Sequence, residues 1–465
     1  MVFTSHVFII FFIVVLCGTL FIQKFFNDGT KYFFLLLASY FFYGWWDWRF
    51  CFLLLFVTAM SYITAVYSHK KTAYITGVAV PLAVLGIFKY FNFFLSSAAS
   101  ITGHEIIMLK IILPVGISFY TFQALSYVID VHRGKIPVEK NFVKLALYIS
   151  FFPQLVAGPI VRASDFLPQL HDKSRRLTGQ NFLIGIQIIA MGFFKKIVLA
   201  DNLSVFVDDV FRVPVAFHWL TIILAVISYS MQIYFDFSGY SDIATGCAKC
   251  LGYDFVMNFN LPYISKSVTE FWRRWHISLS GWLRDYLYIP LGGNRHGKIR
   301  QLINLMITMI LGGLWHGANW TFVFWGGLNG FALCVEKIFT KKKSESGIFL
   351  KLIKIFLTSM FISFTWIFFR AENFSEAWKI IRGIFTLQNG ISQPFSWSFI
   401  AISLLLISEF AAVSKAQKEN QKEIKGFCPI MNLNTITGLT TFFVFVGLIL
   451  GLAFTGINPF VYFQF

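Results

Sequence analysis

Long runs without a charged residue constrain this chain more than any other feature of its sequence. A helix that crosses the hydrocarbon core of a bilayer needs about 20 mostly apolar residues. Windows of that length, with isolated charges tolerated near helix ends, give about eleven to thirteen hydrophobic passes. The sequence therefore predicts an all-α polytopic membrane protein. The longest runs free of Asp, Glu, Lys and Arg are 1–23, 51–69, 111–129, 177–194, 213–235, 301–335, 383–408 and 426–465.

The charged residues indicate the same class of protein. Only 13% of the 465 residues are charged and 57% are hydrophobic, which leaves too little polar surface for a soluble chain. If the chain were soluble, its formal net charge of +17 would suggest that it binds nucleic acid. In a membrane protein, basic cytoplasmic loops and anionic lipid headgroups account for it. We therefore expect the lipid bilayer as a partner and no nucleic acid. Basic clusters expected at the cytoplasmic face are Lys70–Lys71, Lys173 with Arg175 and Arg176, Lys341–Lys343, and the stretch 261–300.

Proline and glycine interrupt several of the hydrophobic runs, at 113–116, 152–159 and 311–314. Irregular backbone at membrane depth is tolerated only where it is buried in protein or lines a cavity. We therefore expect re-entrant segments that surround an internal space. No internal repeat is recognisable, and no matching pair of broken helices occurs in two halves, which disfavours an inverted-repeat transporter.

His316 lies near the middle of the uncharged run 301–335. If the basic flanks at Arg300 and Lys341–Lys343 both face the cytoplasm, this run enters the bilayer and returns, with His316 deep inside. An ionisable residue at such depth is a candidate functional site, and histidine can act as a general base near neutral pH. The alternative is a histidine that is satisfied by a neighbouring carbonyl group. Gly313 and Gly317 would let the backbone approach a substrate closely.

A second candidate, His276, lies forty residues upstream. Taken as one helix, the segment 270–280 resembles an interfacial amphipathic helix. Its arginines Arg273 and Arg274, together with Arg284, could contact lipid headgroups or bind the phosphates of a coenzyme A type carrier. His276 and His316 are too far apart in sequence for a local metal pair, but they can converge in space.

The cysteine pattern predicts neither disulfides nor a metal site. Cys247-x-x-Cys250 is the only spacing typical of metal or redox sites. A zinc site needs two further ligands and a redox motif needs a soluble βαβ context. We interpret this pair as structural.

Eight motifs of the chain together carry a resemblance to a known family. They are PVGISFYTFQ (114–123), FFPQLVAGPIVR (151–162), YFDFSGYSDIA (234–244), NFNLPY (258–263), EFWRRWHISLS (270–280), WLRDYLYIPLGGNR (282–295), LWHGANW (314–320) and FRA (369–371). These motifs resemble those of the membrane-bound O-acyltransferase (MBOAT) family, and within it the bacterial alginate and peptidoglycan O-acetyltransferase branch. The likeness extends over about residues 110–375, and the first 100 and last 90 residues match in hydrophobicity alone.

This resemblance implies one integral-membrane domain over residues 1–465, with a multi-helix bundle around a central tunnel. It implies that His316 is the essential histidine and His276 the second polar position. Such enzymes pass an acyl group from a cytoplasmic thioester outward to a cell-envelope polysaccharide through an extracytoplasmic acetyltransferase partner. We accordingly expect a multi-pass protein of the bacterial cytoplasmic (inner) membrane, with acetyl-CoA as the acetyl donor and no bound cofactor or metal.

The residues suit this chemistry. A neutral His316 could remove the proton of an acceptor hydroxyl group while a nearby donor stabilises the oxyanion. His276 is the expected donor, with Asn319 or a backbone N–H freed at Gly312-Gly313 as alternatives. A covalent acetyl-histidine step stays open. Two other functions stay open as well: D-alanyl transfer to teichoic acid from a carrier-protein thioester, for which the basic stretch 261–300 could dock an acidic carrier, and a non-enzymatic glycan permease or flippase. The permease would need paired charges inside the membrane, and the uncharged runs supply few.

Overall fold

A computed structural model describes residues 1–104, 107–339, 347–393 and 431–456, with the single positions 399, 403, 407 and 460. Lys341–Lys343 and parts of the runs 383–408 and 426–465 lie outside the described residues. The chain divides into two compact units. The first comprises Met1–Gly192, Tyr240–Val256 and Ile430–Phe442, and the second comprises Phe193–Gly239, Met257–Pro429 and Phe443–Phe465. The single domain over 1–465 and its central tunnel stay predictions.

The predicted class of all-α polytopic membrane protein is confirmed. Seven helices among the described residues are long and apolar enough to cross a membrane. Other hydrophobic runs form helices that are shorter or less apolar, or lie partly outside the described residues, so this number lies below the eleven to thirteen passes expected from windows of about 20 residues. The seven candidate spans are His6–Phe25, Arg49–Val66, Lys71–Thr102, Gly179–Arg212, Trp219–Cys250, Trp320–Phe339 and Ile348–Arg370.

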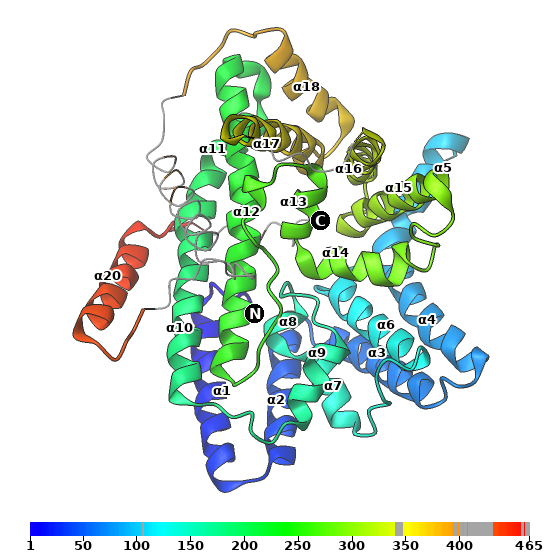
Figure 1. Ribbon diagram of the computed structural model, residues 1–465, viewed down its shortest axis with the longest axis vertical. Helices are drawn as coiled ribbons and strands as arrows, with labels where there is room; N and C mark the ends of the chain where they lie inside the picture. Colours follow the sequence, from blue (N-terminus) through cyan, green and yellow to red (C-terminus); the bar gives the residue numbers. More distant parts are fainter. Residues whose placement is uncertain are drawn as a thin grey trace. The chain divides into compact units, whose positions relative to one another are not determined.

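The first unit holds the N-terminal helices (Figure 1). In it, α6 is buried along nearly its whole length and packs on α3 and α4. Its helices are α1 (His6–Phe25), α2 (Asp28–Gly44), α3 (Arg49–Val66), α4 (Lys71–Leu85), the π-helical turn η1 (Gly86–Tyr90), α5 (Phe91–Thr102), α6 (Ile117–His132), α7 (Phe142–Ser150), α8 (Phe152–Leu155), α9 (Ala163–His171), α10 (Gly179–Phe193) and the end of α12 (Trp219–Cys250).

Two of the predicted Pro-Gly interruptions are confirmed in this unit. The backbone before α6 is not helical, and Gly116, at a φ of 74°, begins α6. A Cβ atom at Gly116 would lie 2.5 Å from the carbonyl oxygen of Leu155, so only glycine fits there. The run 152–159 forms the single turn α8 and then leaves helical geometry.

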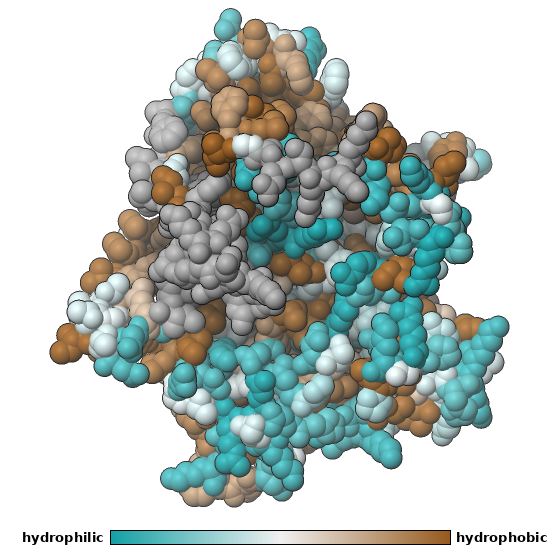
Figure 2. All heavy atoms as spheres, in the orientation of Figure 1, coloured by the Kyte–Doolittle hydropathy of each residue, from teal (hydrophilic) through white to brown (hydrophobic). Residues whose placement is uncertain are grey.

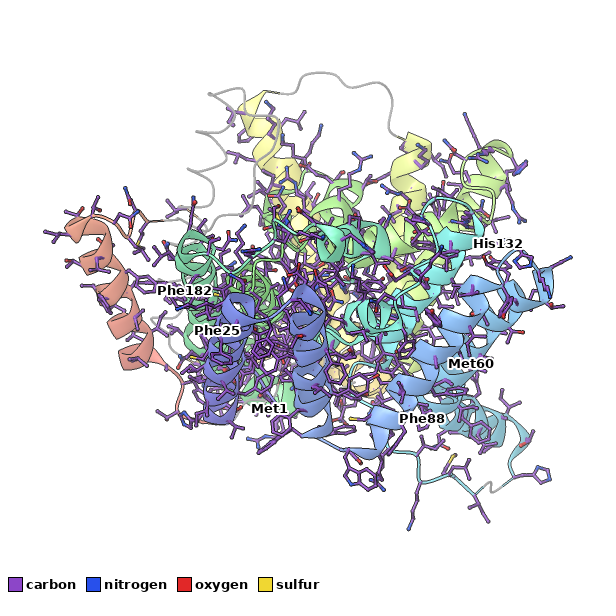
Figure 3. All side chains as sticks on the ribbon, turned by 90° about the horizontal axis from the view of Figure 1, so that it is seen from below. Met1, Phe25, Met60, Phe88, His132 and Phe182 are labelled. Atoms are coloured by element: carbon purple, nitrogen blue, oxygen red, sulfur yellow. The ribbon has the colours of Figure 1, made fainter. Side chains whose placement is uncertain are left out.

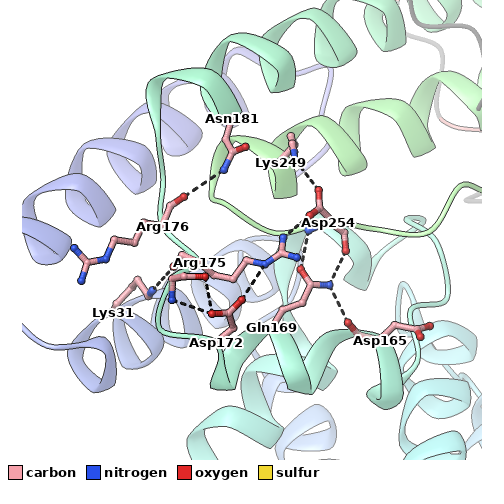
Figure 4. A network of polar contacts seen from close by, with 10 residues as sticks. Lys31, Asp165, Gln169, Asp172, Arg175, Arg176, Asn181, Lys249 and Asp254 are labelled. Carbon is pink, nitrogen blue, oxygen red and sulfur yellow. Dashed lines mark hydrogen bonds and ion pairs between the residues drawn. The ribbon is translucent and has the colours of Figure 1, made fainter.

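Polar residues join the loop between α9 and α10 to the end of α12 (Figure 4). Arg175 forms ion pairs with both Asp172 and Asp254, and Lys249 lies 2.7 Å from Asp254. Gln169 donates to the Asp254 carbonyl oxygen and accepts from its N–H group, both at 2.8 Å. On the face drawn in Figure 2, hydrophilic residues gather over α7, α9 and the loop between α1 and α2. The predicted basic loop at 173–176 is therefore held by carboxylates of its own unit.

The end of α6 is fixed to the loop that precedes α4. His132, labelled in Figure 3, stacks on Tyr74 with ring centroids 3.8 Å apart. Its Nδ1 atom lies 2.8 Å from the carbonyl oxygen of Ser68. This histidine is thus part of the helix packing of the first unit.

The second unit contains both candidate histidines. Its elements are the π-helical turn η2 (Phe194–Ala200), α11 (Asp201–Arg212), the 3₁₀ turn η3 (Pro214–Ala216), the first part of α12, the 3₁₀ turn η4 (Pro262–Ile264), α13 (Val268–Arg274), α14 (Ile277–Leu283), the π-helical turn η5 (Arg284–Tyr288), α15 (Gly297–His316), α16 (Trp320–Phe339), α17 (Ile348–Arg370), α18 (Phe374–Phe385) and the larger part of α20 (Ile436–Leu452).

The uncharged run 301–335 forms a helical hairpin of α15 and α16, as a run that enters the bilayer and returns would require. The expected break at Gly312-Gly313 is wrong, because α15 is helical through both glycines as far as His316. The glycines serve helix packing instead. A Cβ atom at Gly313 would lie 2.2 Å from the carbonyl oxygen of Phe322, and one at Gly326 would lie 2.3 Å from that of Met309. Close approach through small residues is a common way to pair helices in membranes.

Charged residues also occur inside a candidate span, where the uncharged runs gave no sign of them. The helix Gly179–Arg212 continues past the end of the run 177–194 and includes Lys195, Lys196 and Asp201. Lys196 Nζ lies 2.7 Å from carboxylate oxygens of both Asp201 and Asp236. Charged side chains can stay within a buried helix when they pair with opposite charges. A run without charged residues therefore gives a minimum length for a helix and does not mark where the helix ends.

The hairpin packing predicts opposite effects for two adjacent glycines. Gly326→Ala should destabilise the protein by about 1–3 kcal/mol, because the added methyl group meets backbone atoms of α15. Gly327→Ala should stabilise it by up to about 1 kcal/mol, because its Cβ position is open and alanine favours the helix. Thermal unfolding of the two purified variants in one detergent measures the difference. Equal midpoints would contradict the close contact.

Candidate active site

The two predicted histidines lie side by side in the second unit. The ring centroids of His276 and His316 are 6.2 Å apart, with the ring planes inclined by 53°. His276 is 0% exposed and His316 is 4% exposed. Since a hydrogen bond spans about 3 Å, one reacting group between the rings could contact both. The sequence prediction that these residues converge is confirmed.

His276 occupies a tight turn between two short helices. The single amphipathic helix expected over 270–280 is wrong, because α13 ends at Arg274 and α14 begins at Ile277. His276 has a φ of 42°, in the left-handed region, which costs a residue with a side chain roughly 1–2 kcal/mol. Such strain persists where the surrounding structure enforces it.

Asn258 and Asn260 hold this turn in place. The Asn258 carbonyl oxygen accepts from the Ile277 N–H at 2.9 Å, and Asn258 Oδ1 accepts from the Ser278 hydroxyl at 2.8 Å. The Asn260 N–H donates to the Arg274 carbonyl oxygen at 2.9 Å, on the other side of His276. The motif NFNLPY therefore fixes the backbone that presents His276.

His316 is the last residue of α15, about 30 Å along the helix axis from Gly297 at the usual helical rise. Asn319 directly precedes α16: its Oδ1 atom accepts from the Thr321 N–H at 3.0 Å and its Nδ2 atom donates to the Glu372 carbonyl oxygen at 2.7 Å. Both ends of the Asn319 amide group thus hold the turn after His316.

The far end of α16 links the hairpin to the first turn of α13. Glu336 accepts hydrogen bonds from the Thr269 N–H at 2.9 Å and from the Thr269 hydroxyl at 2.7 Å. A carboxylate is stabilising at a helix N-terminus, where N–H groups lack partners within the helix. Helix α16 thus begins beside His316 and ends on the helix that leads to His276.

Aromatic rings enclose both histidines. The rings of Phe237 and His276 are arranged edge to face, with their centroids 4.7 Å apart. The ring centroid of Trp315 lies 5.9 Å from that of His276 and 5.1 Å from that of His316. The ring centroids of Trp325 and Phe369 lie 5.2 and 5.3 Å from that of His316, and both rings meet the imidazole in a T-shaped arrangement. This apolar surrounding excludes water, which strengthens electrostatic interactions inside it.

Trp325 was not a candidate from sequence, because its residue type is common in apolar helices and no motif marked it. The ring is 2% exposed and stacks on Trp366. Its indole nitrogen, within the part of the chain that the structure describes, has no hydrogen-bond acceptor. This indole N–H is a further candidate donor beside His316.

The three arginines predicted to contact the donor lie in different surroundings. Arg273 is exposed on α13. Arg274 donates to Glu270 at 2.9 Å and to the Asn260 carbonyl oxygen at 3.1 Å, so it supports the turn at His276. Arg284 pairs with the adjacent Asp285 at 2.6 Å and keeps 65% of its side chain exposed.

The remaining residues singled out from the sequence, a cysteine of the Cys-x-x-Cys pair and two glycines, lie in helix contacts. Cys250 of the Cys-x-x-Cys pair lies near the close contact of α10 and α12, with its Sγ atom 3.8 Å from the Phe182 carbonyl oxygen. Gly313 and Gly317 face Phe322 and not an open space. Over the described ranges, no group of three or more His, Cys, Asp or Glu side chains could hold a metal ion.

Burial lowers the pKa of His276 to about 3, because the charged imidazolium is poorly solvated there. The histidine is therefore neutral at physiological pH and carries one N–H donor and one acceptor nitrogen.

The lowered pKa predicts a pH-dependent stability. Between pH 6.5 and 3 the unfolded chain protonates His276 and the folded chain does not, so stability falls as the pH drops through this window. The slope from this residue should be at most about 1.4 kcal/mol per pH unit. Thermal unfolding at pH 7.5, 6 and 5 tests this, with His276→Gln as the reference that lacks the titrating group. Parallel pH profiles for the two proteins would contradict it.

The sequence of this chain is similar to those of known membrane enzymes. The model of the MBOAT, membrane-bound O-acyltransferase family matches residues 136–343. The chain is 42% identical to the probable alginate O-acetylase AlgI of Pseudomonas aeruginosa, over 83% of this chain and 75% of that protein. It is 37% identical to a peptidoglycan O-acetyltransferase of Helicobacter pylori, over 77% of this chain and 74% of that protein. It is 27% identical to a teichoic acid D-alanyltransferase of Bacillus subtilis, over 56% of this chain and 69% of that protein.

Proposed function

The chain belongs to the membrane-bound O-acyltransferase family, and we propose that this acyltransferase moves an acetyl group from a thioester to hydroxyl groups of a cell-envelope polysaccharide. The observation that carries the proposal is the pair of buried histidines, 6.2 Å apart inside an aromatic shell. The names of its relatives, which refer to alginate and peptidoglycan, support acetyl as the acyl group and a polysaccharide as the acceptor.

His316 acts as the general base in the proposed reaction. Its neutral imidazole takes the proton of the acceptor hydroxyl group while the oxygen attacks the thioester carbonyl carbon. The resulting oxyanion is stabilised by an N–H donor, either the neutral ring of His276 or the indole of Trp325. Collapse of the tetrahedral intermediate breaks the carbon–sulfur bond, and the imidazolium of His316 returns the proton to the leaving thiolate. The products are an acetyl ester and a free thiol.

Acetyl-CoA is the proposed donor, delivered from the cytoplasm. The excess of basic residues in the stretch 261–300, with Arg273 exposed and Arg284 largely so, supports contact with a phosphate-bearing carrier. The acceptor hydroxyl group would enter from the outer side of the bacterial cytoplasmic (inner) membrane, where an extracytoplasmic acetyltransferase partner would select the polymer.

The test is the release of mild-base-labile acetate from purified peptidoglycan and exopolysaccharide of a null strain that carries wild-type protein or His316→Ala. The wild type should restore acetate on one polymer, and the variant should lower the transfer rate by about 10²–10⁴-fold, the usual contribution of a general base. Asn202→Ala, a change on α11 at matched membrane levels, serves as a control for expression. If neither polymer's acetate depends on the chain, the proposal fails, and D-alanyl ester content of teichoic acid becomes the quantity to compare.

A further inference from the structure

The second unit contains a group of three charged side chains that the proposed reaction does not use. Lys196 of η2 contacts Asp201 of α11 and Asp236 of α12, each at 2.7 Å. The side chains of Lys196 and Asp236 are 2% and 1% exposed, and that of Asp201 is 9% exposed. Ionisable groups buried in a membrane protein are costly and mark functional elements by default.

The π-helical turn explains one of the two contacts, that between Lys196 and Asp201. Residues five apart in an α-helix lie about 140° from each other around the axis, so Lys196 and Asp201 could not meet. In η2 the Asp201 N–H donates to the Lys196 carbonyl oxygen, which is the wider spacing of a π turn. Their side chains then come to the same side of the helix. The contact with Asp201 is thus local, whereas the contact with Asp236 joins η2 to a different helix.

Asp236 stands next to the residue that touches the candidate site. Phe237 meets the His276 ring edge to face at 4.7 Å and also contacts Phe259 at 5.0 Å. Consecutive residues of a helix point about 100° apart. One side of α12 is therefore held by a lysine while the neighbouring side supports the imidazole.

We infer that Asp236 is a positioning residue: its ion pair with Lys196 fixes the rotation and depth of α12 and so holds Phe237 against His276. The inference rests on the proposed acetyl transfer, because it assigns His276 a place in that reaction. Asp236 acts on the site through its neighbour Phe237. Asp201 contacts Lys196 within the same helix, across the π turn.

The two aspartates provide a matched pair of variants. Asp201→Asn and Asp236→Asn each remove one carboxylate charge that pairs with Lys196, but only the second removes a charge carried by α12. In membrane vesicles given labelled acetyl-CoA and the acceptor polymer, Asp236→Asn should lower kcat at least about tenfold, because small misplacements of catalytic groups cost up to about a hundredfold. Its KM for acetyl-CoA should stay within about twofold, and Asp201→Asn should keep kcat within about twofold of wild type. Equal losses in the two variants would overturn the inference.

Phe237→Leu supplies an independent variant, because it removes the ring contact and leaves all three charges. It should also lower kcat, and the double variant with Asp236→Asn should be no slower than the slower single variant, since both changes act through one contact. If the losses of kcat in the two single variants multiply in the double variant, the inference is overturned. A wild-type kcat in Phe237→Leu would also overturn it, even if Asp236→Asn fails to fold. Absence of transfer by the wild-type protein would instead count against the proposed function.

Discussion

The backbone turn at His276 depends on Asn258, and the candidate site depends on that turn. A left-handed histidine between two short helices is unfavourable by itself. The Asn258 carbonyl and side-chain oxygens accept from the two residues after the histidine, and Asn260 bonds the residue two positions before it. With the turn fixed, the short helices α13 and α14 leave in different directions, and the imidazole is presented to His316. A site built in this way is set mainly by backbone hydrogen bonds, which tolerate little displacement.

The aromatic shell gives the two histidines a common environment. Phe237, Trp315, Trp325 and Phe369 come from different helices, and each places a ring against an imidazole. Neutral imidazoles are favoured in such surroundings, and a neutral ring can act as a base or as a donor without prior loss of a proton. The difference between the two roles then rests on which atoms of the thioester and the hydroxyl group each ring meets.

The class of protein, the hairpin around His316 and the convergence of the two histidines could be predicted from the sequence, because each follows from hydropathy or from a motif. Local structure that tertiary contacts decide could not. Gly312 and Gly313 signal a break in an isolated helix, but in the folded chain Gly313 permits the close approach of α16 and Gly312 faces Leu283 of α14. The segment 270–280 has a helical pattern, but hydrogen bonds from residues 258 and 260 break it. Lys196, Asp201 and Asp236 are separated by up to forty residues, so only the folded chain reveals that the lysine pairs with both aspartates.

The π turn at Phe194–Ala200 also decides where this helix can change in length. A π turn contains one residue more than the corresponding α turn. Deletion of one residue between Lys196 and Asp201 would let the helix become regular, and these two residues would then lie four apart, on one face of an α-helix. The helical segments on either side would keep the faces that they present to their neighbours. Deletion of one residue from the regular part of α11 would instead rotate everything beyond it by about 100° around the axis. In this helix, the π turn is therefore the stretch that best tolerates the loss of a residue.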